Sequence, residues 1–97
     1  MAHLEVELVA TDRKVWSGAA SMVSAPAADG DIGILPGHAP LLAVLRPGVV
    51  RIHPREGSER TVRVGSGFLS VDTDRVTVVV DQVEDSGTVD VSAAARR

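Results

Sequence analysis

Residues 60–80 read RTVRVGSGFLSVDTDRVTVVV, and this stretch decides the fold class. Apolar side chains occupy alternate positions in three runs, at 62 and 64, at 69 and 71, and at 76, 78 and 80. Such alternation is typical of a strand with one buried face and one solvated face. Gly65-Ser66-Gly67 and Thr73-Asp74 separate the runs and are turn-forming sequences. The stretch therefore predicts three consecutive strands joined by short connections.

The period of two continues toward the N-terminus. It predicts further strands over residues 4–8, 15–16, 20–25, 32–35, 41–45 and 50–52. Ser17-Gly18 is expected to stop the second strand and Pro26 the third, and Asp29-Gly30 predicts a tight turn. Short strands at regular spacing, with a turn between each pair, indicate an all-β sandwich or barrel.

The run Leu41–Leu45 departs from the alternation because all five of its residues are apolar. Such a run predicts either a strand that is buried on both faces or one turn of a buried helix. Its short length and the flanking Pro40 and Pro47 favour the strand.

Composition limits the function classes. The chain has 97 residues, enough for one domain, and its net charge of −3 argues against general nucleic-acid binding. There is no cysteine, which excludes disulfides and thiolate chemistry. No apolar run is long enough for a membrane span, and no signal peptide is expected. Trp16 and Phe68 are the only aromatic residues, so Val, Leu, Ile and Ala must build the core.

No catalytic constellation is predicted. His3, His38 and His53 are spread along the chain without the paired spacing of a metal site. No serine lies in a nucleophile elbow, and the glycines at 30, 33 and 37 do not open a helix that could cradle a phosphate. The acids at 84, 85 and 90 are interpreted as a solvated end of the chain. We therefore expect no catalytic residue, no cofactor and no metal.

Arginines concentrate in the middle of the chain, at positions 46, 51, 55, 60 and 63, whereas acids dominate after position 71. Two interpretations stay open. The arginines form ordinary solvated strand faces, or they form a polarised surface that orients a docked partner.

The segment GDIGILPGHAPLL, residues 30–42, closely resembles the hallmark loop of the ATP synthase epsilon subunit. Three other segments resemble that family in its order and at its spacing: Val15–Gly18, Leu45–Ile52 and Gly65–Val71. The resemblance covers roughly residues 3 to 92.

The resemblance implies an all-β sandwich of two packed five-stranded sheets over residues 1–88, and a short C-terminal helical stub that begins a truncated helix over residues 89–97. It also implies a non-catalytic rotor subunit of a proton-translocating F-type ATP synthase. In the family this domain grips the gamma subunit, rests on the polar loops of the c-ring and transmits rotation to the catalytic head. The complex would place the chain on the cytoplasmic face of the bacterial cell membrane.

Site residues follow from the resemblance by position. The c-ring loops would be met by Asp29, Gly30 and Asp31. The gamma subunit would be met by Ala10, His38, Leu42 and Ala43. The loop between these groups suits docking, because Pro36 and Pro40 each fix a backbone φ angle and reduce the entropy lost on binding. Asp31 would pair with a basic residue of the ring, although it could equally be a plain turn acid.

The chain departs from the family near its C-terminus. Members usually continue into a two-helix hairpin, and we expect that hairpin to be missing here beyond its first turns. Members that bind ATP carry Ile-Asp-x-x-Arg-Ala, whereas residues 89–94 read VDVSAA, with Ala93 in the arginine position. No ATP binding is therefore expected.

Two alternative functions remain at this point. The first is a stand-alone β-sandwich module for a ligand or peptide, which an exposed aromatic platform would favour. The second is a small metal-dependent enzyme.

Overall fold

The computed structural model describes residues 3–55 and 57–85. This part of the chain contains nine strands and no helix. The strands are β1 (Leu4–Ala10), β2 (Arg13–Ala27), β3 (Gly30–Ile34), β4 (Leu41–Leu45), β5 (Gly48–Pro54), β6 (Arg60–Val64), β7 (Gly67–Asp72), β8 (Arg75–Val80) and β9 (Val83–Asp85). The all-β prediction is confirmed. The helical stub predicted for residues 89–97, and the domain boundary at 88, lie outside the described residues.

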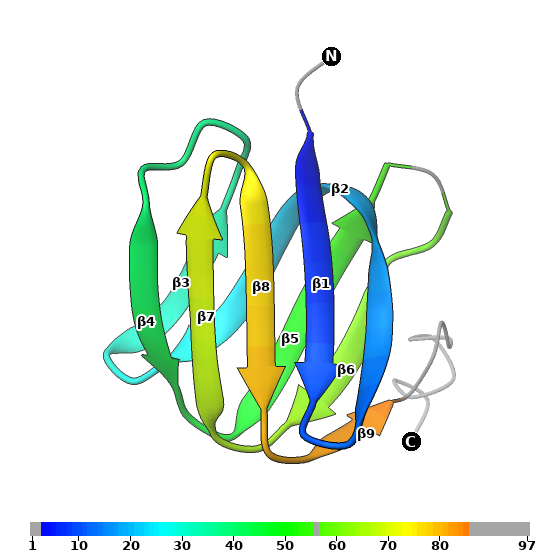
Figure 1. Cartoon of the computed structure of the whole chain (residues 1–97), viewed down its shortest axis with the longest axis vertical. Helices are drawn as coiled ribbons and strands as arrows, with labels where there is room; N and C mark the ends of the chain where they lie inside the picture. The colour runs from blue at the N-terminus through cyan, green and yellow to red at the C-terminus, as the bar shows by residue number, and fades with distance from the viewer. Residues whose placement is uncertain (1–2, 56, 86–97) are drawn as a thin grey trace.

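The strands form two layers that face each other across the core (Figure 1). The front layer runs β4-β7-β8-β1 and ends on the first half of β2. The back layer runs β3, the second half of β2, β5, β6 and β9. β1 and β8 are parallel, and every other pairing is antiparallel, so the sheet is mixed.

β2 joins the two layers, so the nine strands make one continuous hydrogen-bonded sheet instead of two separate five-stranded ones. The predicted stop at Ser17-Gly18 is wrong, because Gly18 has a nearly extended φ of 158° and pairs with Val6. The predicted end at Pro26 is also wrong, since Pro26 pairs with Asp31 of β3. Two predicted strands are therefore one strand of 15 residues, with an irregularity between Ala20 and Met22 where it changes layer.

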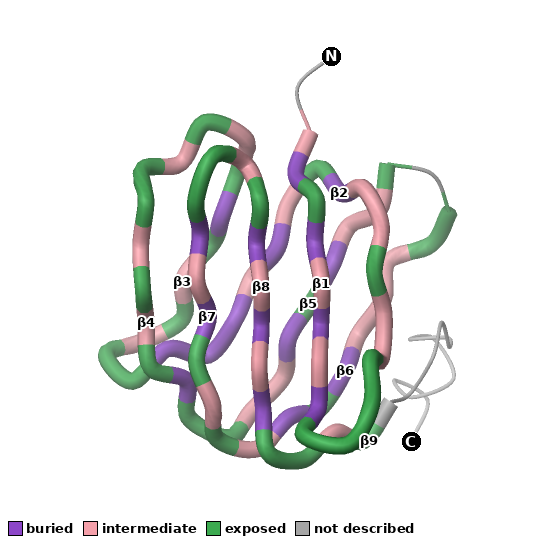
Figure 2. The backbone as a smooth tube through the Cα atoms, viewed as in Figure 1, coloured by how far each residue is buried: buried purple, intermediate pink, exposed green. Residues whose placement is uncertain are grey.

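The core lies between the layers and is aliphatic. Buried positions alternate with exposed or half-buried ones along most strands, as the purple segments in Figure 2 show. Among the largest fully buried side chains are Leu4, Leu8, Ile34, Leu45, Ile52 and Leu69. No polar or charged residue is buried in the described part of the chain. The period of two that predicted the strands therefore also predicted which side chains face the core.

β4 shows that apolar runs are ambiguous. The strand prediction for Leu41–Leu45 is confirmed, but its predicted burial on both faces is wrong. Leu42 is 70% exposed and Val44 is 66% exposed, whereas Leu45 is buried. β4 belongs to the front layer, and the back layer covers only one of its faces. Its outward side chains therefore need another explanation than core packing.

The β7–β8 connection is a tight turn in which two non-glycine residues adopt the left-handed conformation. Thr73 has a φ of 50° and Asp74 a φ of 60°. Aspartate tolerates this region better than most residues do, because its short side chain can form local hydrogen bonds. The predicted turn at Thr73-Asp74 is thus confirmed. Within the described residues, no helix is long and apolar enough to cross a membrane.

Candidate partner-binding site

A row of apolar side chains crosses the outer face of the front layer. Strand register aligns Val44 with Phe68, Phe68 with Val79, and Val79 with Val9. These residues come from the four adjacent strands β4, β7, β8 and β1. In each strand they sit next to inward-facing residues, so they must point away from the core. Leu42 lies two residues before Val44 and on the same face of β4.

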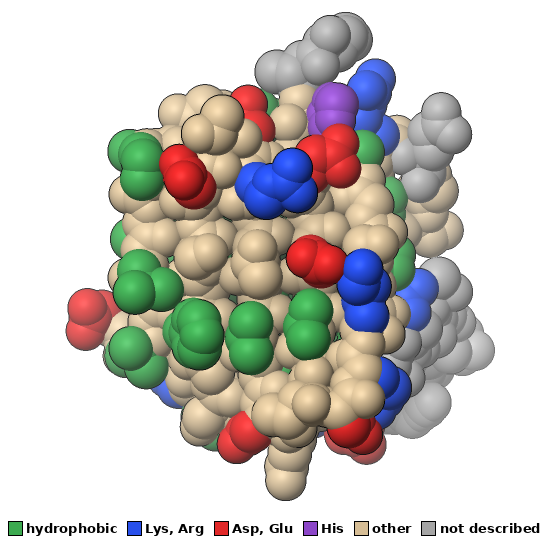
Figure 3. Space-filling model, in the orientation of Figure 1, with side chains coloured by type: hydrophobic (Ala, Val, Ile, Leu, Met, Phe, Trp, Pro, Cys, Tyr) green, Lys and Arg blue, Asp and Glu red, His purple; other side chains and the backbone are tan. Residues whose placement is uncertain are grey.

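We call Val9, Leu42, Val44, Phe68 and Val79 the apolar band. Phe68 is 46% exposed, and Leu42 and Val44 are more exposed still. Figure 3 shows the band as a line of hydrophobic side chains across the front of the molecule. Single exposed apolar residues are ordinary, but a contiguous set on one face marks an interaction surface.

Apart from Leu42, the band was missed from the sequence. Neighbouring residues of a strand point to opposite faces, so a residue is assigned to a face by the register of its strand. Val9, Val44 and Val79 each follow an apolar residue, so the sequence pattern does not show which of the two residues points outward. The sequences of β4 and β8 did contain a signal for outward apolar residues. Each has consecutive apolar residues, and in a strand with one solvated face at least one of two such residues must point outward. The all-apolar run was instead interpreted as two-sided burial.

The structure separates the four residues expected to face gamma. Ala10 is 3% exposed and its side chain faces the core beside Val80. Ala43 is half-buried and packs against the core, whereas Leu42 belongs to the apolar band. His38 is half-buried in the β3–β4 loop. Ala10 lies on β1 and Ala43 on β4, and β7 and β8 lie between these two strands. Each alanine is next to a residue of the apolar band in sequence.

The β3–β4 loop is fixed by hydrogen bonds at its tip. The His38 backbone N–H donates to the Leu35 carbonyl at 3.1 Å, which closes a turn around Pro36-Gly37. The Gly37 N–H donates to the Asp74 carboxylate at 2.7 Å and so ties the loop to the β7–β8 turn. Gly37 has a φ of 88°, which a side chain would disfavour. The β3–β4 loop was predicted to be stiff because of its prolines, and the hydrogen bond to Asp74 restrains it further.

A groove of about 340 Å³ runs along the outer edges of β3 and β4. Both edges are open here, because β3 pairs only with β2, and β4 meets β2 at the single pair Ala27–Leu45. The groove is largely apolar. It is lined mainly by Ala27, Ala28, Asp29, Ile32 and residues 41–44. It therefore connects the apolar band to the turn that carries Asp29.

The three residues expected to face the c-ring lie together. Asp29 is exposed in the β2–β3 turn, and Gly30 and Asp31 begin β3. Gly30 has a φ of 135°, so the predicted tight turn at Asp29-Gly30 is confirmed. The Asp31 side chain is 81% exposed and lies 3.4 Å from a guanidinium nitrogen of Arg46. Arg46 follows β4, so a residue from outside the turn contributes to its charge.

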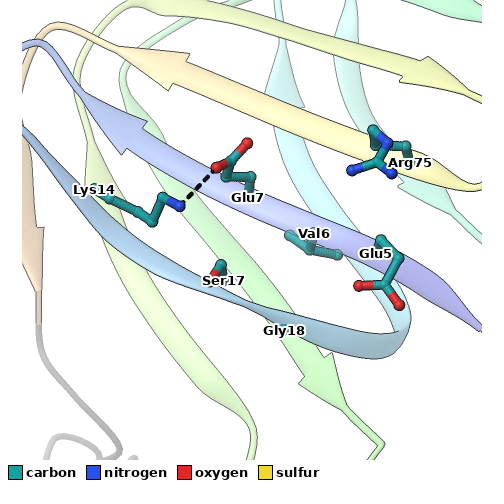
Figure 4. Close-up of a pocket in the computed structure, with 7 residues that line it drawn as sticks. All are labelled: Glu5, Val6, Glu7, Lys14, Ser17, Gly18 and Arg75. Atoms are coloured by element: carbon teal, nitrogen blue, oxygen red, sulfur yellow. Dashed lines mark ion pairs between the residues drawn. The ribbon is translucent and has the colours of Figure 1, made fainter.

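A polar hollow of about 210 Å³ lies at the other side of the front layer (Figure 4). Its charged side chains are Glu5 and Glu7 of β1, Lys14 of β2 and Arg75 of β8. Lys14 pairs with Glu7 at 2.9 Å, and Glu5 pairs with His3 at 2.8 Å. Positive and negative groups alternate across neighbouring strands, so the hollow presents compensated charges.

Metal-ligating side chains do not converge in the described part of the chain. Within residues 3–55 and 57–85 no three His, Asp or Glu side chains are grouped so that they could hold a metal ion. Two arginines of the middle stretch lie on the outer face of the back layer, where Arg51 pairs with Glu59 and Arg63 with Glu84, each at 3.8 Å.

Comparison with known proteins gives a consistent relationship in sequence. The family model described as "ATP synthase, Delta/Epsilon chain, beta-sandwich domain" matches residues 3–86. The ATP synthase epsilon chain of Micrococcus luteus is 53% identical over 78 residues, which are 80% of this chain and 86% of the relative. The epsilon chain of Streptomyces griseus is 45% identical over 95 residues, which are 98% of this chain and 77% of the relative.

Solved structures share the fold at much lower identity. A chain of the mitochondrial ATP synthase of Euglena gracilis, solved with OSCP, F1 and the c-ring, superposes with a TM-score of 0.82 at 19% identity. The match covers 99% of this chain and 61% of that one. A chain from the central stalk and c-ring of the Tetrahymena thermophila enzyme gives a TM-score of 0.70 at 20% identity, over 84% of this chain and 66% of that one.

Proposed function

This chain belongs to the delta/epsilon family of ATP synthase subunits, and we propose that it couples rotation of a proton-driven c-ring, through gamma, to ATP synthesis in the catalytic head. It is an epsilon chain, a non-catalytic subunit of the central stalk of the F-type enzyme. It is therefore part of a membrane-associated complex. We further propose that it works on the cytoplasmic face of the bacterial membrane.

The observation that carries the gamma contact is the apolar band. Leu42, Val44 and Phe68 would expose large apolar surfaces to water in an isolated chain. Burying such surface stabilises a complex by about 25 cal/mol for each Å² removed from water. The band includes Leu42 and adjoins Ala43 and Ala10, and the family resemblance assigns these three positions to gamma. We therefore extend the proposed gamma contact to Val9, Val44, Phe68 and Val79, with the Ala10 and Ala43 side chains acting as support beneath.

The groove between β3 and β4 adds a second element to this contact. We propose that its apolar lining holds one apolar side chain of gamma. Filling the groove would strengthen the contact, since binding energy concentrates in well-packed, desolvated pockets of an interface. His38 lies in the β3–β4 loop, where its ring Nδ1 is 2.7 Å from the Ala39 carbonyl. We propose that His38 packs or hydrogen-bonds at the interface and does not carry protons.

The c-ring contact is proposed for the Asp29–Asp31 turn. Its acids are exposed, and its glycine sets a tight backbone that loses little entropy when it docks. Pairing of Asp31 with a basic residue in the polar loops of the ring would orient the subunit on the ring, since charge pairs contribute specificity and association rate more than affinity.

Co-purification tests the function directly. Co-expression with the cognate gamma subunit is expected to give a one-to-one complex that binds purified c-rings. Reconstituted ATP synthase without the chain is expected to hydrolyse ATP with poor proton pumping. A chain that forms no complex with gamma would refute the proposal and favour the stand-alone binding module.

ATP binding provides a separate test. Ala93, which replaces the arginine of the ATP-binding motif, lies outside the described residues. We propose that the chain does not bind ATP. Isothermal titration should give no heat of binding at micromolar to millimolar ATP, and a saturable signal would refute this.

A further inference from the structure

Arg46 links three elements at the edge where the two layers meet. Its backbone N–H donates to the Pro26 carbonyl at 2.9 Å. Its side-chain Nε donates to the Ala27 carbonyl at 3.0 Å, and its Nη2 lies 3.4 Å from Asp31 Oδ1. One arginine after β4 thus contacts the last two residues of β2 and the start of β3.

The two side-chain contacts of Arg46 differ in permanence. The Nε bond to Ala27 is partly buried and holds the guanidinium in place. The Nη2 contact with Asp31 is long and exposed, because the side chains of Arg46 and Asp31 are 49% and 81% accessible. Exposed ion pairs of this kind contribute little to stability, so solvent or a competing cation can replace them readily.

The position of Asp31 makes the replacement of its ion pair with Arg46 relevant to docking. Asp31 is the acid that the proposed function directs at a basic residue of the c-ring, yet it already has a cationic neighbour within the chain. With Arg46 beside Asp31, the two negative charges of the turn have one positive charge next to them. Its attraction for a cation is therefore weaker than its acids alone would give, and the difference is screened by salt.

We propose that Arg46 is an intrachain competitor for Asp31, so that docking on the ring exchanges one ion pair for another. This inference rests on the proposed contact between Asp31 and the c-ring loops. Arg46 thereby limits the affinity and the salt dependence of ring docking, and it keeps the Asp31 carboxylate oriented before the ring arrives. Because Nε remains bonded to Ala27, the guanidinium stays beside the interface after the exchange.

The test measures the affinity of the complex of this chain with gamma for detergent-solubilised c-rings, at low and high salt. Arg46→Gln is expected to tighten binding at low salt about two- to fivefold, the equivalent of one exposed ion pair. The gain should vanish at high salt and in an Asp31→Asn background. The double-mutant cycle is needed because Arg46→Gln removes the same contact with Ala27 in both backgrounds, and that loss cancels.

The outcomes separate the inference from its premise. If Asp31→Asn leaves ring affinity unchanged, the proposed c-ring contact fails. If Asp31→Asn weakens binding but Arg46→Gln weakens it equally in both backgrounds, Arg46 only supports the turn and the competitor role is refuted. Arg46→Lys is the matched control. It keeps the charge but lacks the fork that contacts Ala27 and Asp31 together, and it should tighten binding less than Arg46→Gln does.

Discussion

The backbone N–H of Gly37 donates a 2.7 Å hydrogen bond to the side chain of Asp74, a residue 37 positions later. The bond joins the β3–β4 loop to the β7–β8 turn at one end of the sandwich. Asp74 has a left-handed φ of 60°, and its own carbonyl accepts a hydrogen bond from the Glu5 N–H at 2.8 Å. The loop that we propose to face gamma is thus held by a residue outside the four sequence segments that carry the family resemblance.

Substitutions at Asp74 distinguish the contribution of its left-handed backbone from that of its side-chain hydrogen bond to Gly37. Asp74→Ala should cost about 1–2 kcal/mol of unfolding free energy, because it loses the bond to Gly37 and adopts the left-handed region less readily. Asp74→Gly relieves the backbone and should stay near wild-type stability. In both variants the Gly37 amide should exchange faster with deuterium and gamma should bind more weakly. Unchanged protection of the Gly37 amide in both variants would show that the hydrogen bond from Gly37 to Asp74 does not form. Asp72→Ala serves as the control.

Gly67 begins β7 at a place where no side chain fits. A Cβ built there would overlap the carbonyl oxygen of Val79 on the neighbouring strand β8. Gly67→Ala should therefore destabilise the protein by at least about 2 kcal/mol, measured by denaturant unfolding. Gly33→Ala is the matched control, because its Cβ would meet only the flexible end of Met22 at 3.4 Å. Its unfolding free energy should change by less than about 0.5 kcal/mol. Equal stability of the two variants would contradict the close approach of β7 and β8.

Leu8 and Leu42 are chemically identical and serve different purposes. Leu8 is fully buried, so Leu8→Ala should lower the unfolding free energy by about 2–5 kcal/mol. Leu42 is 70% exposed, so Leu42→Ala should change stability by less than about 0.5 kcal/mol but should weaken gamma binding. Thermal unfolding and gamma titration of both variants provide the check. Large destabilisation by Leu42→Ala would place that side chain in the core.

Most strands were predictable because period two is a local property of the sequence. The stretches around Val62 and Val76 alternate as a half-buried strand must, and both form strands. The continuity of β2 was not predictable in the same way. A glycine and a proline are usual strand ends, but here Gly18 is extended and Pro26 keeps its place in the pairing with β3. Whether such residues stop a strand depends on partners that are distant in sequence.

Two other features also depended on tertiary pairing. β9 (Val83–Asp85) lies in a segment interpreted as a solvated acidic end, and it forms because β6 offers a free edge. The apolar band depends on the register of four strands, which aligns Val44 with Phe68 and Val79 with Val9. Family resemblance located Leu42 within this surface. It could not show that the Ala10 side chain faces inward while Val9 faces outward.

The central claim is that the apolar band binds gamma, and the dissociation constant of the gamma complex for Val44→Asp and Val49→Asp tests it most directly. Val44 lies on the outer face of the front layer, and Val49 lies opposite Arg63 on the outer face of the back layer. Both changes place one carboxylate on an outward strand position. We predict that Val44→Asp weakens gamma binding about tenfold or more, because it leaves a charge in a desolvated apolar contact, whereas Val49→Asp stays within about twofold. Equal affinity of the two variants for gamma, with both folded, would contradict the account.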